Sequence, residues 1–222
     1  MNHGYHENTY CTSKPGVDHG TIIILPDFPD TNTYESVMHW VTQRGQTALY
    51  PRYPGSMQSH GSFLDEHPGK VITSLAADVA EPPIILLGIG FGSLVALSTA
   101  NRLDVDGIIL YDPWWDIELL EDTEEYVEEA FDHHHYLYRD QREGLPESLR
   151  VFEDLYPYGY VDGIDQEILV FQSADPEIPP EATEEISELL DITVVDHNSV
   201  SIGQCFIQNM DRVYSYVNQA TL

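Results

Sequence analysis

The stretch that decides the fold is residues 83–92, PIILLGIGFG, in which an apolar run leads straight into a glycine turn. Its first part, residues 83–87, is typical of a strand that is buried on both faces of a parallel sheet. Residues 94–102, LVALSTANR, then read as a helix. We therefore expect a strand, a tight turn and a helix in direct succession.

The rest of the chain repeats this alternation of strands and helices. Residues 21–25, TIIIL, form a second buried run that Pro26 ends. Thr33 is the expected N-cap of a helix that ends near Gly45. Further strands are expected at residues 47–50, 107–111, 167–172 and 191–195, and further helices at 71–80, 181–190 and 204–218. Alternation of this kind predicts an α/β fold with a doubly wound, mainly parallel sheet.

Residues 112–165 interrupt the alternation with an acidic segment that is rich in Trp and Tyr. The segment is too long for a simple crossover between neighbouring strands. Amphipathic helices are expected within it at residues 117–131 and 146–155. We expect one domain over residues 1–222, with 112–165 as an ordered helical insertion.

The glycine turn has the setting of a nucleophile elbow, in which a strained central residue exposes its side chain between a strand and a helix. The order of elements around it resembles the α/β-hydrolase family over about 200 residues, with features of esterases and dienelactone hydrolases. The segments that carry the resemblance are residues 26–28 (PDF), 48–55 (ALYPRYPG), 88–92 (GIGFG), 108–113 (IILYDP), 172–179 (QSADPEIP) and His197. The resemblance implies an α/β-hydrolase sheet, with residues 112–165 as a lid over a substrate pocket.

The resemblance also implies a catalytic triad, of which one member is absent. Aligning G-x-S-x-G with residues 88–92 places Gly90 at the nucleophile position, where glycine has no atom to form an acyl intermediate. Asp175 would be the acid and His197 the base, so the order of nucleophile, acid and histidine is kept. We interpret Gly90, Asp175 and His197 as the relic of a triad.

Other residues near the turn offer alternatives. Ser93 is the nearest hydroxyl, although it falls in the first turn of the following helix. Asp112 is a second possible acid, and its simpler interpretation is a turn cap before Pro113. The backbone N–H groups of Phe28 and Phe91 occupy the places of an oxyanion hole, and they survive the loss of a side chain.

Neither a cofactor nor a metal is expected. His133, His134 and His135 are adjacent, so on a helix they point about 100° apart and cannot converge on one ion. Cys11 and Cys205 lie far apart and have no zinc-ligand spacing, and the sequence does not decide whether they pair.

The charge excludes some classes of partner. Nine Lys and Arg face 38 Asp and Glu, a net charge of −29, which disfavours nucleic acid and anionic membrane surfaces. No apolar segment is long enough for a membrane span, and the N-terminus does not resemble a signal peptide. Because the acids are spread over the chain, the composition resembles that of proteins from salt-in halophiles, with salt cations at the surface. We expect a soluble protein inside the cell of a high-salt organism, or in a soluble assembly.

Three functions are consistent with these observations. The first is a hydrolase fold that has lost its nucleophile and binds a small ligand in the old pocket or a protein partner through the lid, with a structural role in an assembly included in this class. The second is an active ester or dienelactone-type hydrolase that uses Ser93 or an atypical mechanism. The third is a Rossmann-like dinucleotide binder, since a Gly-x-Gly turn opens a helix and Asp112 ends the next strand.

Overall fold

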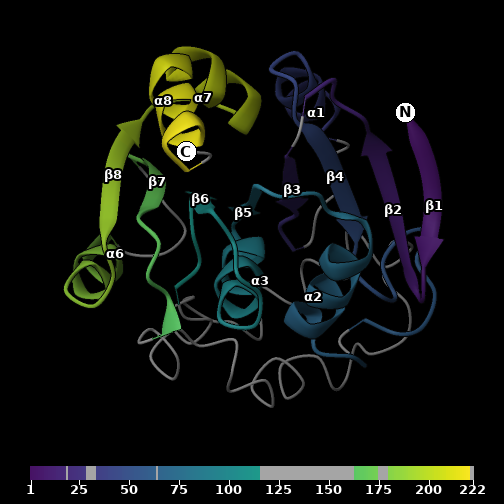
Figure 1. Ribbon diagram of the computed structural model, residues 1–222. Coiled ribbons are helices and arrows are strands. Elements are labelled where there is room, and N and C mark those ends of the chain that lie inside the picture. The colour runs from purple at the N-terminus through teal and green to yellow at the C-terminus, as the bar shows by residue number, and fades with distance from the viewer. Residues whose placement is uncertain (19, 29–33, 64, 116–162, 175–179, 221–222) are drawn as a thin grey trace.

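The computed structural model describes residues 1–18, 20–28, 34–63, 65–115, 163–174 and 180–220 (Figure 1). These residues form an eight-stranded sheet in the order β1-β2-β4-β3-β5-β6-β7-β8. The strands are β1 (Asn2–His6), β2 (Thr9–Lys14), β3 (Thr21–Leu25), β4 (Thr47–Arg52), β5 (Ile84–Ile89), β6 (Gly107–Tyr111), β7 (Ile168–Ser173) and β8 (Ile192–His197). All pairs from β4 to β8 are parallel, which confirms the predicted fold class.

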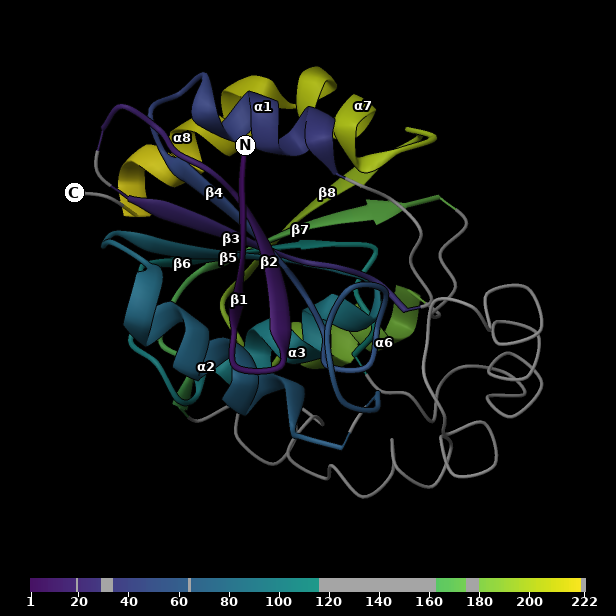
Figure 2. The same ribbon diagram turned by 90° about the vertical axis from the view of Figure 1, so that its right-hand side faces the viewer.

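Helices cover both faces of the sheet. They are α1 (Glu35–Thr42), α2 (Pro68–Val79), α3 (Phe91–Ala100), α6 (Pro180–Ser187), α7 (Ile202–Gln208) and α8 (Met210–Ala220). Figure 2 shows α1, α7 and α8 on one face and α2, α3 and α6 on the other. The two layers bury two hydrophobic clusters, one on each side of the sheet.

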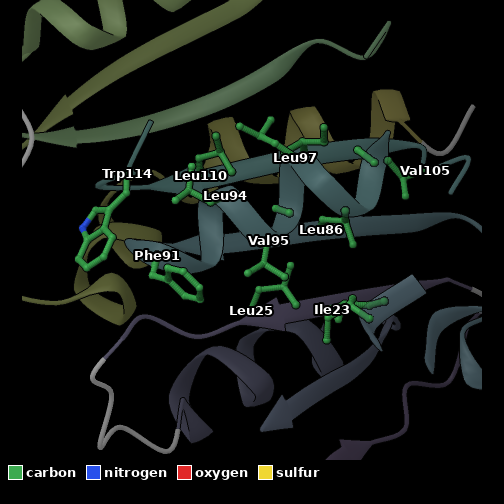
Figure 3. Close-up of a cluster of buried hydrophobic side chains, with 14 of the residues drawn as sticks. Ile23, Leu25, Leu86, Phe91, Leu94, Val95, Leu97, Val105, Leu110 and Trp114 are labelled. Atoms are coloured by element: carbon green, nitrogen blue, oxygen red, sulfur yellow. The ribbon is translucent and has the colours of Figure 1, made fainter. Parts of the chain in front are cut away.

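Helix α3 lies in the middle of one layer, and every one of its residues is buried. In Figure 3, Leu94, Val95 and Leu97 of α3 lie among side chains of β3, β5 and β6. A helix that is apolar all round has to be covered on all sides. This burial fixes the start of α3, and therefore the glycine turn, against the ends of β3 and β5.

An N-terminal hairpin was missed by the sequence analysis. Strands β1 and β2 pair with each other, and β2 pairs with β4, in both cases antiparallel. Their burial is low and β1 is almost wholly exposed, so they lack the apolar run that marks the central strands. The short turn between them places Glu7 at a positive φ of 50°.

The single helix expected at residues 204–218 was wrong, because the structure has two. Helix α7 begins after Ser201, whose hydroxyl accepts a hydrogen bond from the Gln204 N–H, and it ends at Asn209. The Asn209 side chain donates to the Cys205 carbonyl at 3.1 Å, which satisfies a group at the end of α7. Amphipathic spacing continues through the break, so periodicity alone did not reveal it.

Three expectations concern segments outside the described residues. These are the Thr33 N-cap, most of the insertion at 112–165 with its two helices, and the histidines at 133–135. The described start of α1 has Tyr34 at the N-cap position with φ 47°. Among the described residues, no helix is both long and apolar enough to span a membrane.

Cys11 and Cys205 are free thiols. Cys11 packs against the cluster beneath α2 and α3, whereas Cys205 belongs to the cluster on the opposite face of the sheet. Burial raises the pKa of each thiol to about 11.

Tyr216 anchors α8 to the sheet, and it provides a first prediction. Its hydroxyl accepts from the Ile108 N–H at 2.8 Å and donates to the Glu167 carbonyl. Burial is the main cause that raises its pKa, to about 12. Tyr216→Phe leaves both backbone groups without this partner, so we expect the free energy of unfolding to fall by about 1–3 kcal/mol in urea titrations.

The matched control for this prediction is Tyr214→Phe on the same helix. Tyr214 is 51% exposed, so its substitution should change the free energy of unfolding by no more than about 0.5 kcal/mol. Equal losses in the two variants would show that the Tyr216 hydroxyl does not hold α8 to the sheet.

Candidate functional site

The glycine turn between β5 and α3 has the backbone conformation of an elbow. Gly90 adopts φ 49° and ψ −118°, a combination that costs a residue with a side chain of order 1–3 kcal/mol. Its neighbours require glycine for space, because a Cβ at Gly88 would lie 2.6 Å from the Ser93 Cα, and one at Gly92 would run into the Leu25 carbonyl. The close approach of β3, β5 and α3 therefore requires the glycines on either side of residue 90.

The space that a side chain at residue 90 would need is filled by Asp27, which follows β3. A Cβ built on Gly90 would lie within 3.0 Å of Asp27 Oδ1, Cγ and Oδ2. In an enzyme with a serine at the elbow, this space belongs to the nucleophile. Here a carboxylate from the end of a different strand occupies it.

Asp27 also occupies the pair of backbone amides. Its Oδ1 accepts hydrogen bonds from the Phe28 N–H at 2.7 Å and from the Phe91 N–H at 2.8 Å. These are the two groups that the sequence analysis assigned to an oxyanion hole. Phe91 is the first residue of α3, so the helix dipole also favours the negative charge. The amide pair thus already binds an anionic oxygen, supplied by the protein itself.

Asp112 and His197 lie together at the ends of β6 and β8. Asp112 Oδ1 accepts a hydrogen bond from the Ser173 N–H at 2.6 Å and lies 3.5 Å from His197 Nε2. Asp112 has a positive φ of 44°, which Asp tolerates better than most residues. Of the two candidate acids, Asp112 is the one within the described residues, and it lies beside the histidine.

The orientation of His197 differs from that of a catalytic base. Its Nδ1 accepts a hydrogen bond from the Ser199 N–H at 3.2 Å, so the proton of the neutral ring is assigned to Nε2, which faces Asp112. The imidazole is stacked on Tyr111 at 4.8 Å between ring centroids. In the described part of the chain, neither ring nitrogen makes a hydrogen bond to the turn at Gly90.

Two further candidate catalytic residues are Asp175, the expected acid, and Ser93, the alternative nucleophile. Asp175 lies outside the described residues, so its role stays a prediction. Ser93 lies inside α3 with a fully buried side chain, and its hydroxyl has no hydrogen-bond partner in the described residues. Ser93 is also not among the described residues that line the adjacent cavity.

A cavity of about 250 Å³ opens beside Gly90. The described residues that line it are Asp27, Ile89, Gly90, Tyr111, Asp112, Trp114 and Ser173. Burial is the main cause that raises the pKa of Tyr111, with the nearby Asp112 adding to the shift, so the Tyr111 hydroxyl stays protonated at neutral pH. Within the described residues, no group of three or more His, Cys, Asp or Glu side chains could hold a metal ion.

Asp27 is the residue that the sequence analysis missed. It was quoted as part of the loop after the strand at residues 21–25, but it received no role. The available signal was an acidic residue directly before Phe28, combined with a glycine at the nucleophile position. Nothing in a linear pattern shows that the two share one space, because they are 63 positions apart.

The strand order argues against the dinucleotide alternative. From β3 onward the parallel strands follow the order β4-β3-β5-β6-β7-β8, whereas a Rossmann sheet has the order 3-2-1-4-5-6. The Gly-x-Gly turn therefore follows the third parallel strand instead of the first. Asp112 Oδ1 accepts a hydrogen bond from the Ser173 N–H, whereas a dinucleotide binder would use this carboxylate to bind a ribose hydroxyl.

No family model and no curated protein sequence matches the chain. Solved structures do match over nearly the whole chain. Monoacylglycerol lipase from Paleococcus ferrophilus superposes with a TM-score of 0.69 at 16% identity, covering 95% of this chain and 99% of the lipase. A soluble variant of monoglyceride lipase from Saccharomyces cerevisiae, in complex with a substrate analogue, gives 0.69 at 12% identity and covers 100% and 95%.

A third structure, Est1E from Butyrivibrio proteoclasticus with ferulic acid bound, gives a TM-score of 0.68 at 15% identity and covers 98% and 100% of the two chains. Identities this low show a shared fold only. Together with the observed strand order and the elbow, they establish that this chain has the α/β-hydrolase fold.

Proposed function

We propose that this protein binds a small molecule in the cavity beside Gly90 and does not hydrolyse esters through a serine acyl-enzyme. The observation that carries the proposal is the position of Asp27. Its carboxylate fills the space of an elbow side chain and accepts hydrogen bonds from both amides of the oxyanion hole. The Asp27 carboxylate therefore closes the position of the nucleophile and forms a negatively charged part of the cavity wall.

This arrangement opposes serine-type ester hydrolysis at each step. Gly90 offers no nucleophilic atom, and Ser93 is buried within α3. A tetrahedral intermediate needs amide donors for its oxyanion, but those donors already bind a carboxylate, which would repel a second negative charge. His197 directs its Nε2 to Asp112, so the base is not set to activate a nucleophile.

The wild-type protein is therefore expected to show no reaction with a serine-directed fluorophosphonate and no hydrolysis of short p-nitrophenyl esters above the buffer rate. Both assays would be run at molar KCl, with Ser93→Ala as the matched variant. Labelling or turnover that disappears in Ser93→Ala would refute the proposal and establish the ester-hydrolase alternative. Mass spectrometry of molecules that co-purify with the protein would identify a retained ligand.

We also propose that the protein works at high salt. The net charge of −29 supports this, since carboxylates spread over one domain repel one another in dilute buffer. Most of the lid expected at residues 112–165 lies outside the described residues, so the small-ligand function is the one for which the geometry provides support.

A further inference from the structure

Strand β8 forms an open edge of the sheet. It is the last strand in the strand order, and among the described residues only β7 pairs with it, in a regular parallel ladder. Figure 1 shows β8 at one border of the sheet and β1 at the opposite border. An edge strand presents unpaired backbone N–H and C=O groups, so a strand of another chain can pair with it.

The open backbone groups of β8 belong to Ile192, Val194 and Asp196. The Asp191 carbonyl accepts a hydrogen bond from the Ile168 N–H of β7 at 2.8 Å, so residue 191 directs its backbone groups towards β7. Along a strand, the backbone groups of successive residues point alternately to its two sides. Residues 193, 195 and 197 therefore face β7 as well, and every second residue between them faces the open edge.

This edge lacks the features that usually prevent pairing with another chain. Strand β8 reads ITVVDH, so four β-branched residues follow one another and the strand contains no Pro, Gly or Lys. The side chain of Val194 is 42% exposed at this edge. At the opposite border, β1 has Gly4 at its centre, and glycine weakens a strand. Of the two edges, β8 is therefore the one that suits pairing.

The sequence of β8 is complementary to itself in the antiparallel direction. A two-fold axis perpendicular to the sheet keeps the same face of both copies on one side, so each residue opposes a residue of the same face. With the axis at Val194, the two Val194 residues oppose each other and Ile192 opposes Asp196 of the second copy. All the residues that face the edge then form hydrogen-bonded pairs, in which opposed residues exchange both N–H···O=C bonds.

The charges of the strand favour this register. Asp196 is the acid of β8, and with the axis at residue 194 it opposes an isoleucine. An axis at residue 196 would place the two Asp196 side chains opposite each other, and an axis at residue 192 would place Asp196 opposite Glu188 of the second copy. Like charges directly opposite each other destabilise a strand pair. The register at Val194 avoids both conflicts.

The net charge of the whole chain opposes association in dilute buffer. Each copy carries a net charge of −29. Helix α6 lies on the face of the sheet to which Val194 belongs, and exposed acids are found in it at Glu184 and directly after it at Glu188. At about 1 M salt the screening length is only about 3 Å, so these charges repel one another much less. Pairing at the edge should therefore depend on salt.

We infer that β8 is a docking edge for a second copy of this chain, and that two copies join antiparallel through it at molar salt. The joined sheets form one continuous sheet with Val194 at its two-fold axis. This inference concerns a different surface from the cavity beside Gly90, so it does not rest on the proposed function.

The test measures the molar mass of the full chain by size-exclusion chromatography with light scattering, at about 0.05 and about 3 M KCl. Val194→Pro removes an N–H that faces the open edge and keeps the ladder with β7, a change that edge strands tolerate. Val194→Lys places two like charges opposite each other across the axis. Val79→Lys is the control, because Val79 at the end of α2 is 49% exposed and the change in charge is identical.

We expect the wild type to be a dimer at about 3 M KCl and a monomer at about 0.05 M KCl. Val194→Pro should weaken the dimer by about 10-fold to 100-fold in a dilution series, the effect of losing two backbone hydrogen bonds. Val194→Lys should weaken it at least about 10-fold, and Val79→Lys should change the affinity by no more than about two-fold. Thermal melts followed by circular dichroism would establish that the variants are folded.

A second measurement does not alter β8 at all. Replacing Glu184 and Glu188 with Gln should increase the dimer fraction at low salt, because it removes charges beside the edge. A wild type that stays monomeric at about 3 M KCl would refute the inference, as would equal weakening by all three valine variants. Open chains of many copies would show that β8 pairs with the different edge at β1, which would refute pairing about a two-fold axis.

Discussion

Gly90→Ser is expected to destabilise the protein without creating a reactive serine, and adding Asp27→Ala is expected to relieve both effects. A serine at residue 90 has to carry the strain of positive φ, about 1–3 kcal/mol. It also has to displace the Asp27 carboxylate from its amide donors, and each such hydrogen bond contributes about 1.5–3 kcal/mol. With the strain and both hydrogen bonds counted, the variant is expected to lose roughly 4–9 kcal/mol of its free energy of unfolding.

The double variant removes the conflict. Asp27→Ala leaves the amide pair empty and the space at residue 90 open, so only the backbone strain of the introduced serine is left. We expect Gly90→Ser to cost about 1–3 kcal/mol when Asp27→Ala is already present, so that the two substitutions show a large favourable coupling. Because each donor of an oxyanion hole contributes about 100-fold to 1,000-fold in rate, fluorophosphonate should label the double variant at least about 100-fold faster than Gly90→Ser.

Gly61→Ser is the matched control for strain. Gly61 also has a positive φ, 79°, but a Cβ there would meet only one atom, at 4.0 Å. Its substitution should cost about 1 kcal/mol in either background, as measured by urea denaturation at fixed KCl. If Gly90→Ser costs no more than Gly61→Ser, then Asp27 does not occupy the elbow space in solution. A folded double variant that fluorophosphonate labels no faster than Gly90→Ser would show that the Asp27 carboxylate is not what blocks the amide pair.

The central strands could be predicted from sequence because a continuous run of apolar residues indicates a strand that is buried on both faces. Strands β3 and β5 are continuous apolar runs, and both of their faces are covered by helices. The N-terminal hairpin could not be predicted in this way, because its exposed residues show neither an apolar run nor alternation. The break at Asn209 was hidden by amphipathic spacing that continues from α7 into α8.

The candidate site could be predicted only in part, for a similar reason. The elbow at Gly90 was visible because strand, glycines and helix are contiguous in the chain. The meeting of Asp27 with Gly90 depends on β3 and β5 being neighbours in the sheet, and on a side chain that turns across the gap. The partnership of Asp112 with His197 likewise depends on the adjacent ends of β6, β7 and β8. Such contacts follow from topology, so they become visible only when the strands are placed.

The melting temperature is expected to rise steeply with KCl, and this is the second large effect. With a net charge of −29, the carboxylates lie well within the screening length of about 30 Å at 0.01 M salt, so their repulsions add. At 1 M salt the length is about 3 Å, and most of the repulsion disappears. A typical domain is stable by only about 5–15 kcal/mol, so many weak repulsions can decide whether it folds.

The test is a series of thermal melts followed by circular dichroism at pH 7, from about 0.05 to about 3 M KCl. We expect the melting temperature to rise by roughly 10 °C or more. Each kcal/mol gained in the free energy of unfolding raises the melting temperature of a chain of this size by about 2–4 °C. The end of helix α6 offers a specific check, since Glu184 lies in the helix, Glu188 directly follows its last residue, and both are exposed like charges. Replacing both with Gln should raise the melting temperature at low salt and reduce the gain from KCl. The uncharged osmolyte sucrose should raise the melting temperatures of the variant and the wild type equally.

A melting temperature that stays flat across the KCl series would exclude the high-salt interpretation, and the acidic surface would then have to be explained by a basic partner.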